Sequence, residues 1–398
     1  YWGIWVDDIP EYGYKSYRIE LLDEYASKPE SLVVENPILE NKWYKISIDA
    51  KKGAITSIYD KNSKTELVDQ EAEYPLGTFI YEQLGNRSQM EAYTLVDYKR
   101  SLLDTVYIES VVKGAMFDLI RFSGESEESC YSPKGFKSEL RLYHTEPLIE
   151  MHFTIEKKPV TDPEGIYIAF PFQVENGRIF CDVPGGVIEA GVDQIPGSSN
   201  DWNTVQNFVS VRNEKMQILF GSHEVPLTQF GGINTGRFEA GATPETTHLY
   251  SWPMNNYWVT NFNADQQGSF SWSYYITTRD NNFLKEANQV GWENRIPFLS
   301  RVIPAGDKEN ALTSGSVLDF STEDVLIINV KPINGSMLLL QMREVNGKNA
   351  ELSVLRPDKL GDYKLQQSDV TGEPIADPDT KLNFKPYETK FFRIHLED

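Results

Sequence analysis

Hydrophobic and polar residues alternate along much of this chain. Apolar residues occupy every second position in 151–155, 270–276 and 392–396, with mainly polar residues between them. Because successive side chains of a β-strand point to opposite faces, this pattern predicts strands that bury one face. One-sided burial is typical of antiparallel sheets that pack as sandwiches. We therefore predict an all-β protein.

Turns and irregular stretches divide the predicted strands into groups. Glycine, proline or asparagine mark turns at 52–53, 133–135, 162–165, 184–186 and 346–347. The stretch 293–322 is irregular, and strands resume at Val325. The chain has 398 residues, more than the roughly 250–300 at which single cores stop growing. We therefore expect a large β-domain over 31–300, then a linker and a smaller C-terminal β-sandwich over 301–398.

One helix is predicted before this boundary. Asp280 is expected to cap its start, and Gly291 is expected to end it in a left-handed conformation. The apolar face of this helix has helical spacing at Phe283, Leu284, Ala287 and Val290.

The charge of the chain limits its partners. It carries 59 acidic and 38 basic residues, a formal net charge of -21. This argues against nucleic acids and anionic membranes as partners. No apolar run approaches the roughly 18–20 residues of a membrane span, and no signal peptide is found. The chain opens at Tyr1 in the middle of an alternating pattern, which favours a fragment or a processed product.

Motifs for catalysis or metal binding are missing from the sequence. The five histidines form no HxH or HExxH pair. His144 and His152 share strand parity, but about 26 Å would separate them on a straight strand. There is no GxSxG, GxGxxG or P-loop motif. Cys130 and Cys181 are either a disulfide or two buried thiols. We predict no catalytic residue and no metal site in this chain.

Two places are candidates for ligand contact. Residues 252–262 combine aromatic rings, which can lie flat on a sugar, with amides that both donate and accept hydrogen bonds. Asp182 stands where a strand meets the 184–186 turn, and Glu164 stands in a similar place. The substrate-binding candidates are Asn255, Asn256, Tyr257, Trp258, Asn261 and Asp182. The alternatives are edge or core packing for the aromatic segment and, favoured for Asp182, an Asx hydrogen bond within its own turn.

Several segments, in order, resemble one family. Residues 39–69 contain Glu40-Asn41 at the start of a strand, a turn glycine at Gly53 and a strand that ends in Asp60-Lys61. Together with segments at 75–79, 140–150, 253–262 and 325–396, they resemble the C-terminal β-domains of glycoside hydrolase family 38, the α-mannosidases. Residues 1–30 resemble the end of a small β-domain that precedes the large one.

This resemblance implies a fold and a role. The fold would be an antiparallel super-sandwich of the galactose-mutarotase type, followed by the smaller sandwich. The parent protein would be a retaining α-mannosidase whose zinc and nucleophile lie in an upstream barrel. Partners would be an α-mannoside glycan and the upstream barrel and helical domain. This chain would be non-catalytic, supporting the barrel and lining its cleft. A secreted or periplasmic location is favoured, and the linkage stays open because the arginine-rich loop of Golgi-type members is not found.

Two other functions fit the same sequence. The aromatic segment at 252–262 also suits an independent carbohydrate-binding module. A super-sandwich also occurs in polysaccharide lyases, so the chain could be the C-terminal β-domain of such an enzyme. If neighbouring domains are missing, an apolar patch should be exposed on the surface of this chain.

Overall fold

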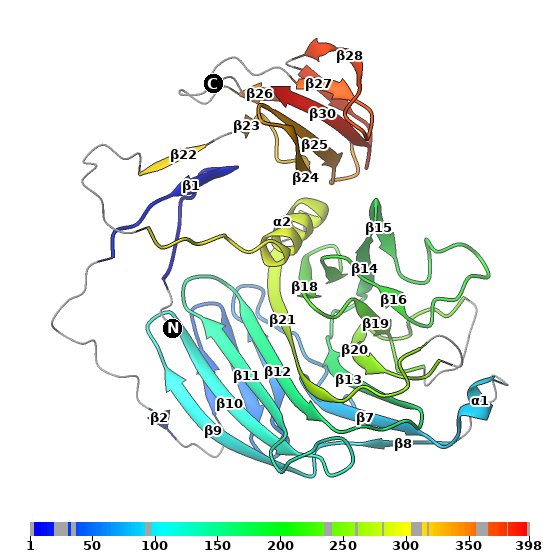
Figure 1. Ribbon diagram of the computed structural model, residues 1–398. Helices are drawn as coiled ribbons and strands as arrows, with labels where there is room; N and C mark the ends of the chain where they lie inside the picture. Colours follow the sequence, from blue (N-terminus) through cyan, green and yellow to red (C-terminus); the bar gives the residue numbers. More distant parts are fainter. Residues whose placement is uncertain are drawn as a thin grey trace. The chain divides into compact units, whose positions relative to one another are not determined.

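The structure is a computed structural model, and it confirms the all-β prediction (Figure 1). The residues that it describes are 4–19, 31–32, 37–91, 97–234, 241–258, 262–280, 282–303, 313–316, 318–355, 365–379 and 381–395. The chain forms two compact units, a larger one over Ser27–Ile296 and a smaller one that combines Tyr1–Ala26 with Pro297–Asp398. In the described residues, every strand pairing between named strands is antiparallel, and two helices are present.

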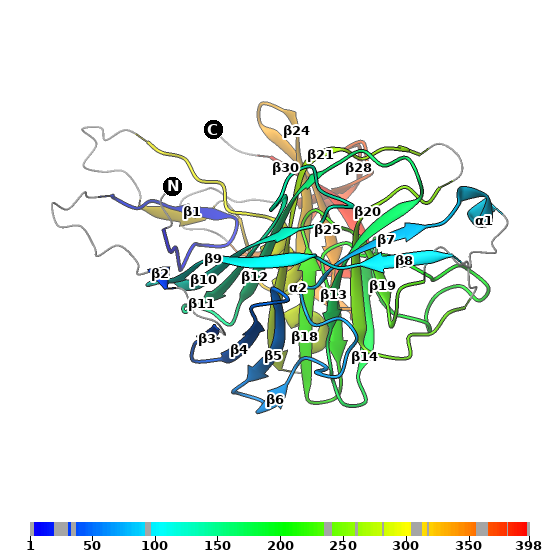
Figure 2. The ribbon, with the colours of Figure 1, turned by 90° about the horizontal axis from the view of Figure 1, so that it is seen from below.

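The larger unit contains three sheets among its described residues. The ten-stranded sheet has the order β15 (Gly186–Glu189), β14 (Arg178–Val183), β17 (Val209–Arg212), β18 (Met216–Ser222), β21 (Gly268–Asp280), β12 (Ile149–Lys157), β11 (Phe136–Tyr143), β10 (Phe117–Glu125), β9 (Thr105–Lys113) and β2 (Ser31–Leu32). The six-stranded sheet has the order β16 (Asn203–Thr204), β19 (Leu227–Phe230), β20 (His248–Asn255), β13 (Glu164–Pro171), β7 (Phe79–Leu84) and β8 (Tyr98–Ser101). The four-stranded sheet, seen as a separate group in Figure 2, comprises β3 (Ile38–Glu40), β4 (Tyr44–Asp49), β5 (Ala54–Asp60) and β6 (Thr65–Glu66).

One core joins these three sheets. Phe153 of β12, Phe170 of β13 and Ile46 of β4 all belong to it. Tyr274 of β21 contacts Phe170 with ring centroids 4.8 Å apart, which ties the ten-stranded sheet to the six-stranded one. β13 is buried along its whole length, because Tyr167 on its other face lies in a second apolar cluster. The predicted super-sandwich is therefore confirmed.

Helix α2 (Phe283–Arg295) corrects the predicted helix ends. Asp280 is the last residue of β21, and Asn282 takes the N-cap position without a side-chain hydrogen bond. The helix continues through Gly291 instead of ending there. A Cβ at Gly291 would lie 3.0 Å from the Phe208 ring. Glycine at this position therefore allows the helix to pack closely against Phe208, and it does not form the left-handed cap that was expected. Ala287 is buried beside Phe208, so α2 covers part of the outer face of the ten-stranded sheet.

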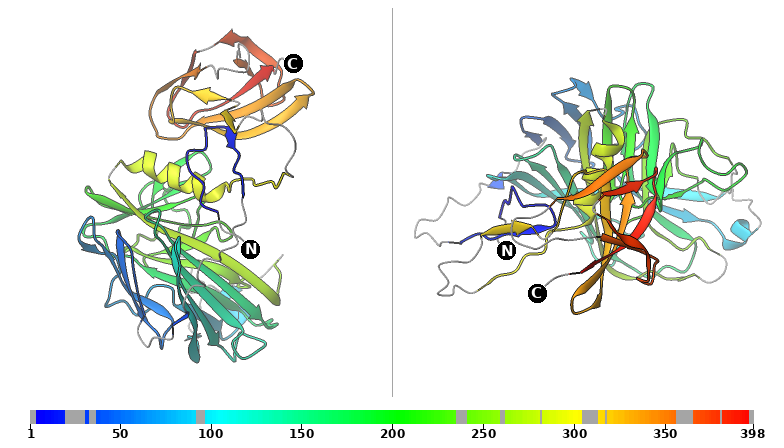
Figure 3. Two further views of the ribbon diagram at one scale, coloured as in Figure 1. Left: turned by 90° about the vertical axis from the view of Figure 1, so that its left-hand side faces the viewer. Right: turned by 90° about the horizontal axis from the view of Figure 1, so that it is seen from above.

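The smaller unit is a second β-sandwich, as predicted (Figure 3). Its five-stranded sheet has the order β24 (Val325–Asn334), β25 (Met337–Glu344), β30 (Thr389–His395), β27 (Leu365–Ser368) and β28 (Pro374–Asp379). Three further strands pair as β23 (Asp319–Phe320), β26 (Ala350–Leu355) and β29 (Lys381–Phe384). Leu340, Leu352 and Phe392 pack between these sheets.

The first described residues belong to the smaller unit. β1 (Gly13–Lys15) pairs with β22 (Ser314–Ser316), which brings together segments about 300 residues apart in sequence. The assignment of residues 1–30 to the end of a separate preceding domain stays a prediction, as do the other expected boundaries. Large apolar side chains are exposed in the stretch 298–303, and Leu299 is 100% exposed. Exposed apolar surface is thus present, while the expected cause, a missing neighbour, stays a prediction.

The two cysteines are separate, buried thiols. This settles the alternative that the sequence left open. Burial raises the pKa of the Cys181 thiol to about 12, so it stays protonated at neutral pH.

A buried ion pair links the two largest sheets where β12 passes to β13. Lys157 ends β12 and is 0% exposed, and Glu164 begins β13 and is 3% exposed. The Lys157 Nζ lies 2.8 Å from the Glu164 Oε1, and the Tyr81 hydroxyl donates to the other carboxylate oxygen. Burial raises the pKa of Glu164 in spite of these partners. Glu164 thus faces the interior and does not extend from a turn.

Replacing Lys157 by methionine is expected to lower the free energy of unfolding of the larger unit by about 3–5 kcal/mol, because the Glu164 charge would be left buried without its cation. Urea unfolding, followed by tryptophan fluorescence, measures this change. Adding Glu164→Gln should recover most of the loss, since the amide oxygen still accepts from Tyr81.

The matched control is Lys99→Met. Lys99 pairs with Glu128 on the surface, where the Lys99 side chain is 64% exposed, so a change within about 1 kcal/mol is expected. If Lys157→Met lowers the free energy of unfolding no more than Lys99→Met does, the buried pair matters no more for stability than a surface pair.

Candidate functional site

The predicted binding segment lies at the end of β20 in the six-stranded sheet. Asn255 is the last residue of this strand, and Asn256, Tyr257 and Trp258 follow it. Asn256 and Tyr257 are buried, whereas Trp258 is 37% exposed. Asn261 lies outside the described residues. The segment therefore divides into an inner part and an exposed ring.

The Asn256 side chain joins two loops. Its Nδ2 donates to the carbonyl oxygens of Val160, Asp162 and Ala264 at 3.2, 3.0 and 2.9 Å. Its Oδ1 accepts the backbone N–H of Glu164 at 2.6 Å. The amide thus satisfies backbone groups of the crossover from β12 to β13 and of the loop before β21.

Tyr257 belongs to a buried polar network around Glu82. The Tyr257 hydroxyl donates to Glu82 Oε1 at 2.6 Å, and Arg100 Nε donates to Glu82 Oε2 at 2.7 Å. Glu82 is completely buried. Burial opposes the charge of Arg100, but the Glu82 carboxylate raises the pKa of Arg100 overall. Trp252 packs beside this network, and its ring stacks on that of Tyr167 with the ring centroids 5.6 Å apart. Trp252 is therefore a buried core residue, which confirms the packing alternative for this ring.

Arg87 fixes the exposed end of the segment. It begins the short helix α1 (Arg87–Glu91). One of its terminal nitrogens donates to the carbonyl oxygens of Asn256 and Trp258, at 2.8 and 2.6 Å, and the other donates to that of Thr161 at 2.9 Å. The rings of Trp258 and Trp202 make a T-shaped contact, with their centroids 5.5 Å apart. Sequence reasoning missed Arg87, because no motif distinguishes it among the 38 basic residues.

Asp182 bonds to a distant segment of the chain, the residues just before β17. It lies buried in β14, and its Oδ1 accepts the N–H groups of Asn207 and Phe208 at 2.7 and 3.0 Å. The favoured alternative, an Asx bond within its own turn, is therefore wrong: the carboxylate anchors the segment that enters β17. Among the described residues, the hydrogen bonds of Asp182 do not reach the segment after β20, so the structure does not join all the candidates in one cluster. Sugar contact by the six candidates stays a prediction.

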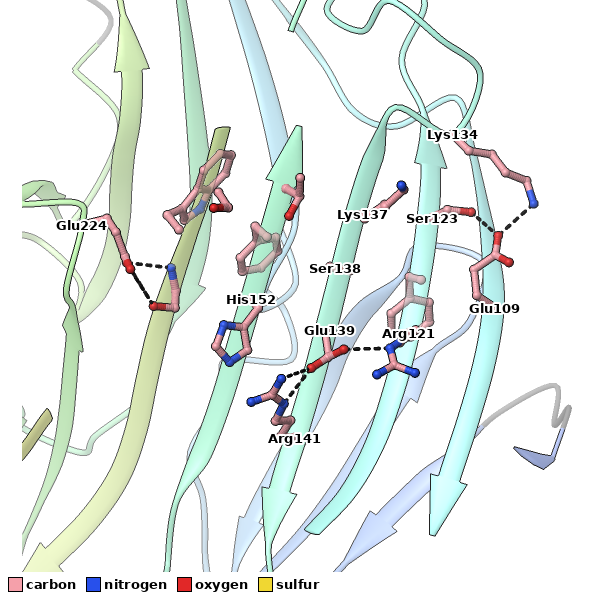
Figure 4. Close-up of a pocket in the computed structure, with 16 residues that line it drawn as sticks. Glu109, Arg121, Ser123, Lys134, Lys137, Ser138, Glu139, Arg141, His152 and Glu224 are labelled. Carbon is pink, nitrogen blue, oxygen red and sulfur yellow. Dashed lines mark hydrogen bonds and ion pairs between the residues drawn. The ribbon is translucent and has the colours of Figure 1, made fainter. Parts of the chain in front are cut away.

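A hollow of about 660 Å³ lies elsewhere, on the outer face of the ten-stranded sheet (Figure 4). Its lining comes mainly from β9, β10, β11, β12 and β21 and consists of Glu109, Arg121, Phe122, Ser123, Lys134, Lys137, Ser138, Glu139, Arg141, His152, Phe153, Thr154, Glu224, Ser271, Trp272 and Ser273. The alternating pattern predicts that polar residues of these strands face outward. It does not predict which of them lie side by side, because that depends on the pairing register.

The first of two polar rows crosses this hollow through Arg121, Glu139, His152 and Ser273, which are direct partners on neighbouring strands. Arg121 Nε donates to Glu139 Oε2 at 2.8 Å, and Arg141 Nε donates to Glu139 Oε1 at 2.6 Å. Burial opposes ionisation of Glu139, but the two arginines lower its pKa overall. This row is therefore charged and held in place.

The second row runs parallel through Ser123, Lys137, Thr154 and Ser271. The Ser123 hydroxyl donates to Glu109, which also accepts from Lys134 Nζ at 2.8 Å. Figure 4 shows Lys137 between Glu109 with its bonded partners and Glu139 with its two arginines.

The described residues do not suit a metal. They contain no group of three or more histidine, cysteine or carboxylate side chains that could hold an ion. His144, His152 and His248 each face one carboxylate, at 3.1, 3.4 and 3.0 Å, whereas zinc sites need three or four protein ligands. Likewise, no helix in the described ranges has both the length and the apolar character to cross a bilayer.

Comparison with known proteins identifies relatives. Residues 39–220 match the family model of the glycosyl hydrolases family 38 C-terminal domain. No curated protein matches the chain. An α-mannosidase from Enterococcus faecalis V583 has a similar solved structure, with a TM-score of 0.64 and 13% identity over 89% of this chain and 42% of that chain. A protein in glycosyl hydrolase family 38 from Enterococcus faecalis has a TM-score of 0.65 and 12% identity over 93% of this chain and 45% of that chain.

The chain thus spans less than half the length of these two solved structures. A galactose mutarotase-like protein from Lactobacillus casei ATCC 334 has a TM-score of 0.37 and 10% identity over 61% of this chain and 100% of that chain. At 12–13% identity the two Enterococcus faecalis structures show likeness of fold, and the family model supplies the assignment. Residues 39–220 of this chain belong to the C-terminal domain of glycosyl hydrolases of family 38.

Proposed function

We propose that this chain is the non-catalytic C-terminal region of a retaining α-mannosidase, and that its larger unit supports the catalytic barrel and lines the substrate cleft. The family match over residues 39–220 carries this proposal. The fold of an Enterococcus faecalis α-mannosidase, similar over 89% of this chain, supports it. This chain covers 42% of that protein, so more than half of that protein lies outside the similar region and has room for a catalytic part.

We place zinc and the nucleophile in that catalytic part. Within the part of the chain that the structure describes, no group of side chains fits a zinc site, and the three histidines that face carboxylates each have one such partner. We therefore derive no metal-dependent step from these residues. The glycan partner would be an α-mannoside.

Within the larger unit, Trp258 is the residue best placed to line a cleft. Its ring is partly exposed, while its backbone is clamped by Arg87 and the preceding Asn256 is fully bonded. An exposed aromatic ring on a rigid support can lie against the apolar face of a sugar at little entropic cost. Asn256 and Tyr257 would act by positioning this ring.

The isolated 398-residue chain is expected to show no hydrolysis of 4-nitrophenyl α-mannoside, with or without added zinc, because the proposal puts the chemistry outside it. The full gene product, including any sequence encoded upstream of Tyr1, should hydrolyse the same substrate and lose activity with a chelator. Release of nitrophenol measures both. Zinc-dependent turnover by the isolated chain would contradict the proposal.

In the full gene product, Trp258→Ala is expected to lower kcat/KM for an α-mannoside about tenfold, equivalent to about 1.4 kcal/mol of transition-state binding. Unfolding stability should change little, because the ring is partly exposed. Tyr131→Ala is the matched control, since this tyrosine is also an exposed aromatic residue of the larger unit. Equal kcat/KM for the two variants would exclude a cleft role for Trp258.

Asn256→Ala should act differently from Trp258→Ala. It removes an amide that satisfies three carbonyl groups and one N–H group, so we expect the free energy of unfolding to fall by at least about 2 kcal/mol. Urea unfolding of the isolated chain measures this. A loss of mannoside turnover at unchanged stability would instead indicate that Asn256 contacts the substrate directly.

A further inference from the structure

The outer face of the ten-stranded sheet carries a polar track that the proposed function does not use. It consists of the two rows already described, Arg121–Glu139–His152–Ser273 and Ser123–Lys137–Thr154–Ser271. The track runs across β10, β11, β12 and β21, and Glu109 extends it to β9 (Figure 4). Neighbouring strands lie about 4.8 Å apart, so five strands span about 19 Å. This is long enough for several linked sugar rings.

The charges of the track favour a neutral ligand. Four cationic side chains, Arg121, Lys134, Lys137 and Arg141, line the hollow together with three carboxylates, Glu109, Glu139 and Glu224. An anion on the track would meet the carboxylates, and a cation would meet the arginines and lysines. A ligand without net charge avoids both repulsions.

The hydrogen-bonding groups favour a ligand with many hydroxyls. The Glu139 carboxylate accepts from Arg121 and Arg141, and its two oxygens still have lone pairs to share. A sugar hydroxyl can donate to such a carboxylate and accept from the neighbouring guanidinium at the same time. Because ion pairs hold these groups on strands, little order would be lost on binding.

The second row also has groups that are available to a ligand. Within the described ranges, the side chains of Lys137, Thr154 and Ser271 make no hydrogen bond, and all three face the hollow. They stand side by side on β11, β12 and β21, so one ligand could reach all of them.

We propose that this hollow binds a neutral oligosaccharide along the two polar rows, as a site separate from the segment around Trp258. The choice of an α-mannoside as that oligosaccharide rests on the proposed function. The site would hold a glycan chain on the β unit without taking part in bond cleavage.

The test is calorimetric titration of the 398-residue chain with a linear α-mannotetraose. The wild-type chain should give a saturable signal. Thr154→Arg places a long side chain into the middle of the track and should abolish it. Lys137→Ala removes a donor without filling the space and should weaken binding about tenfold, or about 1.4 kcal/mol.

Lys45→Ala is the matched control, because Lys45 is an exposed lysine in β4 of the four-stranded sheet, away from the hollow. It should bind as the wild type does. Urea unfolding of each variant checks that it is folded. If Thr154→Arg does not fold, Lys137→Ala still tests the site. A uronic acid tetrasaccharide should bind at least about tenfold more weakly than the neutral one.

Three results would overturn this site: no saturable binding by the wild-type chain, unchanged binding by folded Thr154→Arg and Lys137→Ala, or tighter binding of the acidic tetrasaccharide. The proposed function fails in a different measurement. Thr154→Arg should leave hydrolysis of 4-nitrophenyl α-mannoside by the full gene product unchanged, since a single sugar need not reach the hollow. Absence of a titration signal for the wild-type chain, together with normal hydrolysis by the full gene product, would therefore refute the hollow alone.

Discussion

The buried charges of Lys157 and Glu164 constrain the whole larger unit. They lie at one of the places where the chain leaves the ten-stranded sheet and enters the six-stranded sheet, here through the short loop 158–163. Taking two charges out of water costs several kcal/mol per ion, and the pair offsets this only while its geometry holds. The raised pKa of Glu164 agrees with that cost. The sheets must therefore meet at a fixed position, because any shift between them would separate the two ions.

The residues around this pair explain why the aromatic segment after β20 is so rich in polar side chains. Asn256 bonds the same crossover loop, and Arg87 reaches Thr161 in it as well as Trp258 beyond it. Most of the polarity there satisfies backbone groups of loops that have no strand partner. The Asn256 amide, which belongs to the pattern that suggests a sugar surface in the sequence, is thus needed by the fold. Among the described residues of 252–262, only Trp258 is exposed.

The sequence predicts strands well where one face is buried and less well elsewhere. Alternation in 151–155 and 270–276 identifies β12 and β21, but β13 is buried on both faces and shows no alternation. Gly291 has the residue type of a helix end but serves packing against Phe208, a contact that only the tertiary structure reveals. The rows of the hollow depend on the register between paired strands such as β12 and β21, whose partners His152 and Ser273 are about 120 residues apart in sequence. No local pattern encodes that register.

The outer face of the ten-stranded sheet changes character along β21. Tyr275 faces outward under α2, beside Ala287 and Val290, and is buried. The next outward positions of the same strand are Ser273 and Ser271, where the helix no longer covers the sheet. Protein interfaces are depleted of charged residues at their centres, whereas the uncovered part of this face carries charged side chains that are paired with one another. Such a surface suits water or a hydrated ligand better than the flat apolar side of a neighbouring domain. The exposed apolar stretch at 298–303 is therefore suited to a different kind of partner from the hollow.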